Sequence, residues 1–268
     1  MSHQGKTVLV VGATGSVGRH VVEVALEQGY NVRALVRDLA KAKEFPKQVH
    51  LAQGDITRPE TLLPAVDGID AVVFTHGSDG QGKAGAESID YGGVRNVLRA
   101  LGPTRVRIAL MTAIGVTNRS SSYNKSTESA DWKRRAERLV RASGNPYTIV
   151  RPGWFDYNGP KEHQFVFLQG DKRHTGTPKD GVIARRQIAE VLVQSLSSVS
   201  ATRKTLELVA VEGPAQRDLE PLFAALEADI EGALDAVKDV ANQPLEEEPQ
   251  RVRDDLNAAR GASRAPKG

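Results

Sequence analysis

Short apolar stretches alternate with helical patterns along most of this chain, and that alternation limits the fold more than any single motif does. Stretches that are apolar throughout are typical of strands buried on both faces. The expected strands are Thr7–Val11, Asn31–Val36, Val49–Ala52, Asp70–Thr75, Val106–Met111, Tyr147–Val150 and Thr205–Val209. The expected helices are Val17–Gln28, Pro59–Val66, Ala86–Leu101, Glu128–Ala142 and Arg185–Ser195. This order predicts an α/β fold, a doubly wound parallel sheet with helices on both faces.

The first expected strand runs directly into a glycine-rich loop that opens an apolar helix. The loop reads Gly12-Ala13-Thr14-Gly15-Ser16-Val17-Gly18, a G-x-x-G-x-x-G spacing. Glycines allow the tight turn, the close approach of the backbone to a pyrophosphate and the packing of the helix on the sheet. The free N–H groups at the helix start then favour the phosphates. A dinucleotide site is therefore predicted, with contacts from Gly12, Thr14, Gly15, Ser16, Val17 and Gly18; a purely structural turn is the alternative.

The cofactor type depends on the end of the second expected strand, Leu35-Val36-Arg37-Asp38. NAD-binding chains usually carry an acid there, which accepts a hydrogen bond from the ribose 2′-hydroxyl. Here Arg37 comes first, and its planar guanidinium can pair with a 2′-phosphate. Lys41 and Arg19 add positive charge nearby. The pattern favours NADP (NADPH). Asp38 leaves NAD as the less favoured alternative, and a solvated strand end is the alternative role for Arg37.

Two further strand ends carry residues that suit a nucleotide. Asp55 and Ile56 follow the third strand, where the acid can accept from the adenine amine and the isoleucine can pack on the ring. An N-cap of the next helix is the alternative role for Asp55. His76 and Gly77 follow the fourth strand, at the edge where ligands bind in such sheets. We include both in the predicted cofactor site; a proton-donor role for His76 is the weaker interpretation.

The 268-residue chain contains no cysteine, which excludes disulfides and cysteine–zinc sites and fits a reducing cytoplasm. No apolar run is long enough to span a membrane, and the N-terminus lacks a signal-peptide pattern. The net charge of +3 is weak evidence for a nucleic-acid partner. One helix has a basic side with Glu137 interleaved, for which we expect a solvated face: Lys133, Arg134, Arg135, Arg138 and Arg141. We expect a cytoplasmic protein with no metal, nucleic-acid or membrane partner.

The last quarter of the chain differs in pattern. Residues 218–241 carry an apolar stripe at helical spacing: Leu219, Leu222, Phe223, Leu226, Ile230, Leu234 and Val237. An amphipathic helical extension is therefore predicted over 214–243. Its stripe either packs on its own domain, which we favour, or forms a homodimer contact. Residues 244–268 are charged, and a mobile tail is predicted there.

Several motifs, in this order along the chain, are shared with one known group. They are GATGSVGRHVV, LVRD, QGDI, GIDAVVF, WKRRAERLVRASGNPYTIVRPG and ARRQIAEVLVQSL. Together they resemble the atypical short-chain dehydrogenase/reductase (SDR) superfamily, in its NAD(P)-binding, NmrA-like group. The likeness covers about Lys6 to Val211. It implies a Rossmann-type domain over 1–213, with a small substrate region at about 153–184. It also implies cofactor contacts at Lys133 and at the turn Pro152, Gly153, Trp154 and Phe155.

The chain departs from the wider superfamily at the catalytic pair. In the usual Tyr-x-x-x-Lys arrangement, the lysine lowers the pKa of the tyrosine and binds the nicotinamide ribose. Ser129 stands where that tyrosine would be, four positions before Lys133. Lys133 is therefore expected to position the cofactor. Thr112, at the end of the fifth strand, takes about the place of the superfamily's serine and is the other catalytic candidate. Substitute donors without a spacing argument are Tyr91, Tyr123 and Tyr157.

The favoured function is that of an NADPH-dependent oxidoreductase acting on a small carbonyl, enone or quinone-like substrate. A non-catalytic NADP(H)-sensing protein would share every cofactor residue and is the main alternative. A sugar-nucleotide epimerase or dehydratase is disfavoured, because such enzymes need the catalytic tyrosine and a larger substrate region.

Overall fold

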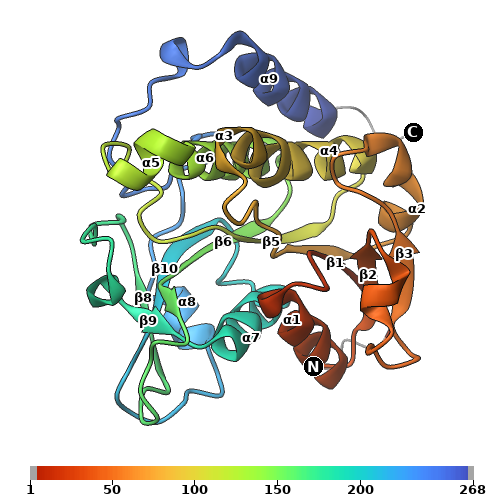
Figure 1. Cartoon of the computed structure of the whole chain (residues 1–268), viewed down its shortest axis with the longest axis horizontal. Coiled ribbons are helices and arrows are strands. Elements are labelled where there is room, and N and C mark those ends of the chain that lie inside the picture. Colours follow the sequence, from red (N-terminus) through yellow and green to blue (C-terminus); the bar gives the residue numbers. More distant parts are fainter. Residues whose placement is uncertain (1–4, 265–268) are drawn as a thin grey trace.

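The computed structural model describes residues 5–264 and is built around one sheet of ten strands (Figure 1). The strand order is β3-β2-β1-β4-β5-β6-β10-β9-β7, and β8 pairs with β10. The strands are β1 (Thr7–Val11), β2 (Asn31–Val36), β3 (His50–Gln53), β4 (Ala71–Phe74), β5 (Arg107–Met111), β6 (Tyr147–Pro152), β7 (Trp154–Phe155), β8 (Gln164–Leu168), β9 (Val182–Ile183) and β10 (Lys204–Val211). All seven expected strands are present, within a few residues of their expected limits.

Neighbouring strands from β3 to β10 run parallel, which confirms the doubly wound, Rossmann-type fold. The order reverses between β1 and β4, because β2 and β3 lie on one side of β1 and the later strands on the other. Beyond β10 the pairing changes, since β8 and β9 both run antiparallel to it. These short strands belong to residues 153–184, for which the resemblance implied a small substrate region.

Helices cover both faces of the sheet. The α-helices are α1 (Ser16–Glu27), α2 (Leu63–Val66), α3 (Gly82–Gly85), α4 (Gly92–Leu101), α5 (Ser122–Thr127), α6 (Ser129–Ala142), α7 (Arg185–Ser195), α8 (Glu220–Ala224) and α9 (Gln250–Arg264). Short 3-10 turns are η1 (Leu39–Ala42), η2 (Pro59–Thr61), η4 (Pro178–Asp180) and η5 (Leu245–Glu247). Helices α1 and α7 pack together below the sheet in Figure 1, whereas α4 and α6 cover it from above and α9 lies over them.

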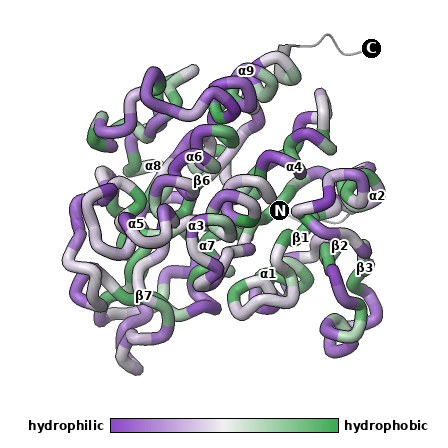
Figure 2. Tube along the Cα trace, turned by 45° about the horizontal axis from the view of Figure 1, so that its top comes forward, coloured by the Kyte–Doolittle hydropathy of each residue, from purple (hydrophilic) through white to green (hydrophobic). Residues whose placement is uncertain are grey.

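Alternate residues of each central strand point into two separate cores. Val8 and Val10 of β1 face α1 and α7, whereas Leu9 and Val11 face the layer of α4 and α6. All four are fully buried. Figure 2 shows the hydrophobic character of strand β1. Burial on both faces explains why these strands are apolar throughout and could be recognised from sequence.

The helix expected at Ala86–Leu101 begins four residues earlier and contains a π-helical segment, η3 (Ala86–Tyr91), between α3 and α4. A π turn inserts one extra residue per turn and is often found at functional sites. Here it turns the side chain of Asp90 toward α6, where it meets a lysine.

The predicted helical extension over 214–243 is wrong. Only Glu220–Ala224 forms a helix, and residues 225–244 are irregular. Leu219 and Phe223 are buried in the core beneath the sheet, but Ile230 is 67% exposed, so the stripe is not one continuous surface. The favoured packing on its own domain is correct for these two residues and for Leu226, which is buried in the same core, and Leu222 and Leu234 are partly buried against the two cores. The alternative, a homodimer contact, depended on one continuous apolar helix face, which the chain does not form.

Arginines of α6 and β6 explain why the extension is not a helix. Asp235 pairs with Arg134 at 3.0 Å and with Arg138 at 2.7 Å, and Asp239 pairs with Arg151 at 2.6 Å. A buried guanidinium without a carboxylate would be costly, so the acidic segment extends across α6 to reach Arg134 and Arg138. Asp239 adds a further carboxylate to Arg151, which also pairs with Glu137 at 2.7 Å. In Figure 2 hydrophilic colour recurs along α6, although this segment and α9 cover it.

The solvated basic face predicted for α6 is therefore also wrong. Four of its five basic residues are buried: Arg134, Arg135, Arg138 and Arg141. Lys133 is the exception, with a side chain that is one-fifth exposed.

The tail predicted to be mobile over 244–268 is instead ordered as far as the structure describes it. Helix α9 packs on α6 and α4 through Val252 and Leu256, both buried. Glu248 forms ion pairs with Arg135 at 2.6 Å and Arg138 at 2.9 Å. Glu248 is one of the charged residues for which solvent contact was predicted, and its ion pairs instead hold this segment against α6. Residues 265–268 lie outside the described range. Within residues 5–264, no helix has the length and apolar character needed to cross a membrane.

Candidate functional site

The glycine loop lies between β1 and α1, at the point where the strand order reverses. Gly12 has φ +88°, and a Cβ there would come within 2.7 Å of the His76 nitrogen. A Cβ on Gly18 would lie 2.0 Å from the Gly12 oxygen, so both positions require glycine. No side chain caps the start of α1, which leaves its first N–H groups free to meet phosphates.

The other loop residues differ in their access to a ligand. Gly15 and Ser16 are exposed and Thr14 is half-buried, so all three can contact a pyrophosphate. Val17 is only 3% exposed and packs in the core, so its contribution is limited to its backbone.

The end of β2 separates the roles of Arg37 and Asp38. The Asp38 carboxylate accepts from the Ala40 N–H at 2.9 Å and so caps η1. Arg37 is exposed and makes no hydrogen bond or close ion pair with any residue that the structure describes. Arg19 pairs with Glu44 at 2.7 Å. Among the described residues near this strand end, Arg37 therefore remains open to an anionic group, as does the exposed Lys41.

Asp55 and Ile56 lie next to this strand end, after β3. Asp55 Oδ1 accepts from the Thr57 N–H at 2.9 Å and from its hydroxyl at 2.8 Å, so the turn-capping role is present. Ile56 is half-buried, and its carbonyl accepts from Asn96 of α4 at 2.7 Å. The adenine contacts predicted for this pair stay a prediction.

His76 lies at the end of β4, beside the glycine loop. Its Nε2 is 3.1 Å from the Ile89 carbonyl oxygen; a carbonyl only accepts, so Nε2 carries the proton. Nδ1 is then an acceptor, and it is buried without a partner among the described residues. Burial lowers the pKa of His76 to about 4, with the charge of Lys133 adding to the effect and Asp90 opposing it. The ring is therefore neutral at pH 7, which does not suit the proton-donor role. Gly77, the next residue, is exposed.

Lys133 is held on α6 by two side chains. Its Nζ donates to Asp90 Oδ2 at 2.8 Å and to Ser129 Oγ at 3.1 Å. Asp90 also accepts from the Ser78 N–H at 2.9 Å and from the Ser78 hydroxyl at 2.8 Å, and its side chain is only 2% exposed. Ser129, in place of the tyrosine, thus serves as a hydrogen-bond partner of the lysine.

Sequence reasoning missed Asp90 and Ser78. Asp90 lies 43 residues before Lys133 in an ordinary helical pattern. Only the π turn of η3 directs it toward α6, and no local signal predicted that turn.

Two of the four candidate proton donors are engaged elsewhere. The Thr112 hydroxyl donates to Glu137 Oε1 at 2.7 Å, and the Tyr91 hydroxyl donates to Asp255 at 2.8 Å. Burial, reinforced by Asp255, raises the pKa of Tyr91 well above its usual range. Tyr123 and Tyr157 are each 64% exposed. The geometry thus gives no support to Thr112 or Tyr91 as donors, and the catalytic role of Thr112 stays a prediction.

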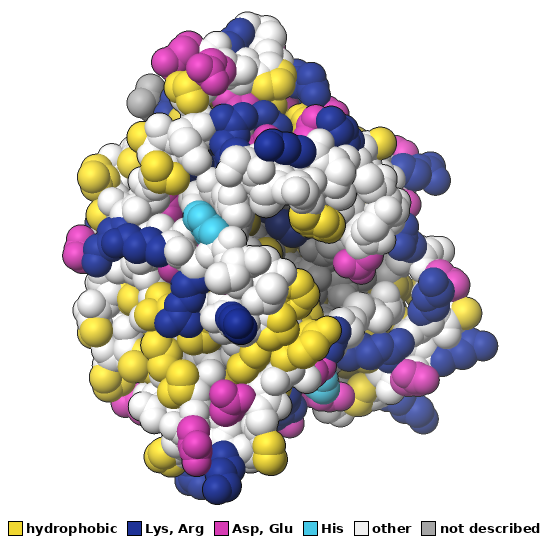
Figure 3. Space-filling view, turned by 60° about the vertical axis from the view of Figure 1, so that its left-hand side comes forward, with side chains coloured by type: hydrophobic (Ala, Val, Ile, Leu, Met, Phe, Trp, Pro, Cys, Tyr) yellow, Lys and Arg dark blue, Asp and Glu magenta, His cyan; other side chains and the backbone are white. Residues whose placement is uncertain are grey.

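The turn after β6 places aromatic rings at the same edge of the sheet. Pro152 ends β6, and a Cβ on Gly153 would lie 2.4 Å from the Gly181 oxygen, so only glycine fits between β7 and β9. Trp154 is 36% exposed and lies edge-on to Tyr157, with ring centroids 6.0 Å apart. Phe155 is half-buried. Figure 3, viewed from the side of α5 and β8, shows a hollow in this face with hydrophobic and basic side chains around it.

Comparisons with known proteins identify the family of this chain. A family model described as NAD(P)H-binding matches residues 12–198. The chain is 32% identical over 203 residues to an NAD(P)H azoreductase of Xenophilus azovorans, covering 71% of this chain and 63% of that protein. It is 30% identical over 211 residues to the photosystem II assembly factor Ycf39 of Synechocystis, covering 75% and 62%. It is 26% identical over 261 residues to the sanguinarine reductase of Eschscholzia californica, covering 81% and 95%.

Solved structures support the fold. An anaerobillin reductase from Escherichia coli superimposes with a TM-score of 0.63 at 20% identity, covering 79% of this chain and all of that one (100%). A short-chain dehydrogenase/reductase from Veillonella parvula, in complex with NADP, gives 0.60 at 17% identity, covering 76% and 94%. The chain therefore belongs to the NAD(P)H-binding family, within the atypical short-chain dehydrogenase/reductase group that its motifs resemble.

Proposed function

We propose that this protein is an NADPH-dependent oxidoreductase that reduces a small planar carbonyl, enone or quinone-like compound. The observation that carries the proposal is Lys133, held by Asp90 and Ser129 on the helix that the family uses for the nicotinamide ribose. The side chain of Lys133 is 20% exposed, so its ammonium can still donate a hydrogen bond to a ribose hydroxyl. A cytoplasmic location remains part of the proposal.

Arg37 supports NADPH over NADH. Its guanidinium is exposed at the end of β2, whereas the neighbouring carboxylate of Asp38 is used to cap η1. A 2′-phosphate offers Arg37 a charge-assisted pair that a 2′-hydroxyl does not.

Each part of the site has a separate task in this mechanism. Gly12–Gly18 would bind the pyrophosphate, and Lys133 would orient the nicotinamide ribose. When bound, NADPH supplies the hydride. His76 stays a predicted cofactor contact; its Nδ1 is buried and has no partner among the described residues. The hydroxyls of Thr112 and Tyr91 are engaged, so the proton would come from water, from the substrate itself or from another residue outside α6.

The aromatic pair Trp154–Tyr157 supports a planar acceptor. Flat π systems stack on or against such rings, and both rings are accessible at the edge of the sheet. The relatives named azoreductase and sanguinarine reductase are consistent with a reductase.

The test is oxidation of NADPH against a panel of carbonyls, enones and quinones, followed by loss of nicotinamide absorbance. We expect turnover with at least one quinone or enone. Tyr157→Ala should raise the KM for that acceptor several-fold, since contacts between aromatic rings are worth about 0.5–1.5 kcal/mol. Leu63→Ala, a similarly exposed hydrophobic residue on α2, is the control and should leave the KM unchanged. Tight NADPH binding without oxidation by any acceptor would contradict the enzymatic proposal.

The second candidate is an NADP(H)-sensing protein without turnover. It is favoured by the engaged state of the hydroxyls of Thr112 and Tyr91, and by a relative that is named as an assembly factor. The same acceptor panel separates it from the reductase.

A further inference from the structure

We propose that helix α9 positions Lys133 for the cofactor, with Asp255 as the positioning residue. The inference rests on the proposed function, because it concerns how the nicotinamide half of NADPH is held. It assigns a role to the C-terminal segment, which lies outside the region that the family model matches.

The residues beside the Asp90–Lys133 pair form a second contact between the same two elements. Tyr91 follows Asp90 in η3, and Trp132 precedes Lys133 in α6. Their rings lie 5.3 Å apart, and the two residues are 1% and 2% exposed. Any shift between η3 and α6 would therefore disturb the ring contact and the ion pair together.

Helix α9 contacts both rings from the side away from the sheet. Asp255 Oδ2 accepts from the Tyr91 hydroxyl at 2.8 Å. The Arg251 guanidinium lies 5.3 Å from the centre of the Trp132 ring, and its Nε donates to Glu87 of η3 at 2.7 Å. One helix thus holds the π turn and the start of α6 in a single arrangement.

Asp255 is suited to fix this arrangement. Its side chain is 6% exposed, and its other oxygen accepts from Arg99 of α4 at 2.6 Å. A buried carboxylate is stable only where such donors converge, so it tolerates little displacement. A π turn is rare and occurs mostly as a single turn within an α-helix, frequently at functional sites.

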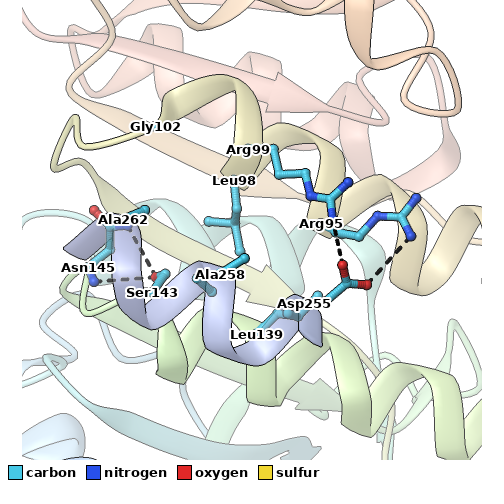
Figure 4. A pocket seen from close by; sticks show the side chains of 11 residues that line it. Arg95, Leu98, Arg99, Gly102, Leu139, Ser143, Asn145, Asp255, Ala258 and Ala262 are labelled. Atoms are coloured by element: carbon cyan, nitrogen blue, oxygen red, sulfur yellow. Dashed lines mark hydrogen bonds and ion pairs between the residues drawn. The ribbon is translucent and has the colours of Figure 1, made fainter. Parts of the chain in front are cut away.

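Beyond Asp255 the packing of α9 becomes loose. Figure 4 shows a hollow between α4, α6 and α9, with a volume of about 170 Å³. Ala258 and Ala262 of α9 line it opposite Leu98 and Leu139, and these small side chains do not fill the space. Asp255 lies at the margin of this hollow, and the contacts of α9 with Tyr91, Glu87 and Trp132 come from Arg251 and Asp255 in its first half.

The experiment compares two nucleotides by calorimetric titration. NADPH requires the Lys133 end of the site, whereas 2′,5′-ADP reaches only the glycine loop and Arg37. In Tyr91→Phe and Asp255→Ala we expect the Kd for NADPH to rise about tenfold. This is the effect of losing about one hydrogen bond between a displaced Lys133 and the cofactor. The Kd for 2′,5′-ADP should stay within about twofold. Asp255→Asn keeps an oxygen for the Tyr91 hydroxyl and should restore NADPH affinity.

Tyr147→Phe is the matched control. Its buried hydroxyl also donates to a buried carboxylate, Asp229 at 3.0 Å, but on β6 away from Lys133. It should lower the melting temperature as Tyr91→Phe does and change neither Kd. Equal weakening of both nucleotides by Tyr91→Phe, or no weakening of either, would overturn the positioning role. A wild-type protein that binds neither nucleotide would instead refute the proposed function, and the inference with it.

Discussion

Replacing Lys133 by methionine removes the charge at the centre of the proposed site and leaves its length almost unchanged. The Nζ group is 2.8 Å from Asp90 and 3.1 Å from Ser129. A charge-assisted hydrogen bond from it to the ribose is worth about 1.5–3 kcal/mol. The Kd for NADPH should therefore rise roughly tenfold to a hundredfold. Calorimetric titration of the wild type and of Lys133→Met measures this directly.

The same change also affects folding. Methionine would leave the Asp90 carboxylate, which is 2% exposed, with only its two bonds from Ser78. Breaking a buried ion pair costs about 3–5 kcal/mol, and the partial exposure of Lys133 places this case near the lower figure. For a chain of this size the melting temperature should fall by roughly 6–12 °C. Titrations must therefore be made well below the melting temperature of the variant.

A second substitution separates the two effects. Adding Asp90→Asn to Lys133→Met removes the uncompensated carboxylate, so stability should return in part while NADPH binding stays weak. Unchanged NADPH affinity in Lys133→Met would refute the role of the lysine. Ser129→Ala should change little, since the hydroxyl only supports Nζ. If it abolished turnover and left affinity intact, the serine would be catalytic and this account of the helix would be wrong.

Three further changes test other parts of the structure. Arg37→Ala should remove a preference for NADPH over NADH of roughly tenfold to a hundredfold, measured by titration of both; equal affinities in the wild type would bring Asp38 forward as an NAD ligand. Burial raises the pKa of Glu207 from 4.5 to about 7; the charge of Arg151 opposes this shift and that of Asp171 adds to it. The folded state therefore holds this proton more tightly than the unfolded state, and the free energy of unfolding falls as the pH rises from 4.5 through 7. Glu207→Gln should remove up to about 3 kcal/mol of that fall, read from melting temperatures across this range; an unchanged pH profile would contradict the assignment. Truncation after Gly213 removes Asp235, which pairs with Arg134 and Arg138, and Asp239, one of the carboxylates that pair with Arg151. The shortened chain should therefore aggregate or melt far below the full chain, whereas an unchanged melting temperature would show that the segment is dispensable.

The sheet and the glycine loop could be predicted because their signals are local. Fully buried strands read as unbroken apolar runs, and Gly12 and Gly18 occupy positions where a Cβ collides with backbone. The arginines of α6 show the limit of such reasoning. Arg134 and Arg138 have the spacing of a solvated face, and the carboxylate that buries them, Asp235, lies 101 and 97 residues further on.

The C-terminal errors have the same origin. Leu219, Phe223 and Ile230 fit a helical period, but Asp229 accepts from Tyr147 and Thr205, and these contacts draw the chain away from helix. Long-range charge pairing outweighs a local apolar stripe here. Asp90 was missed for a related reason, because its role depends on a π turn and on a lysine of another helix.

A crystal structure of the complex with NADP⁺ tests the central claim most directly. The account predicts the pyrophosphate at Gly12–Gly18, the 2′-phosphate beside Arg37, and a nicotinamide ribose hydroxyl within hydrogen-bond distance, about 2.7–3.2 Å, of Lys133 Nζ. A nucleotide bound elsewhere, or one whose nicotinamide ribose does not reach Lys133 while Asp90 retains the lysine, would contradict it.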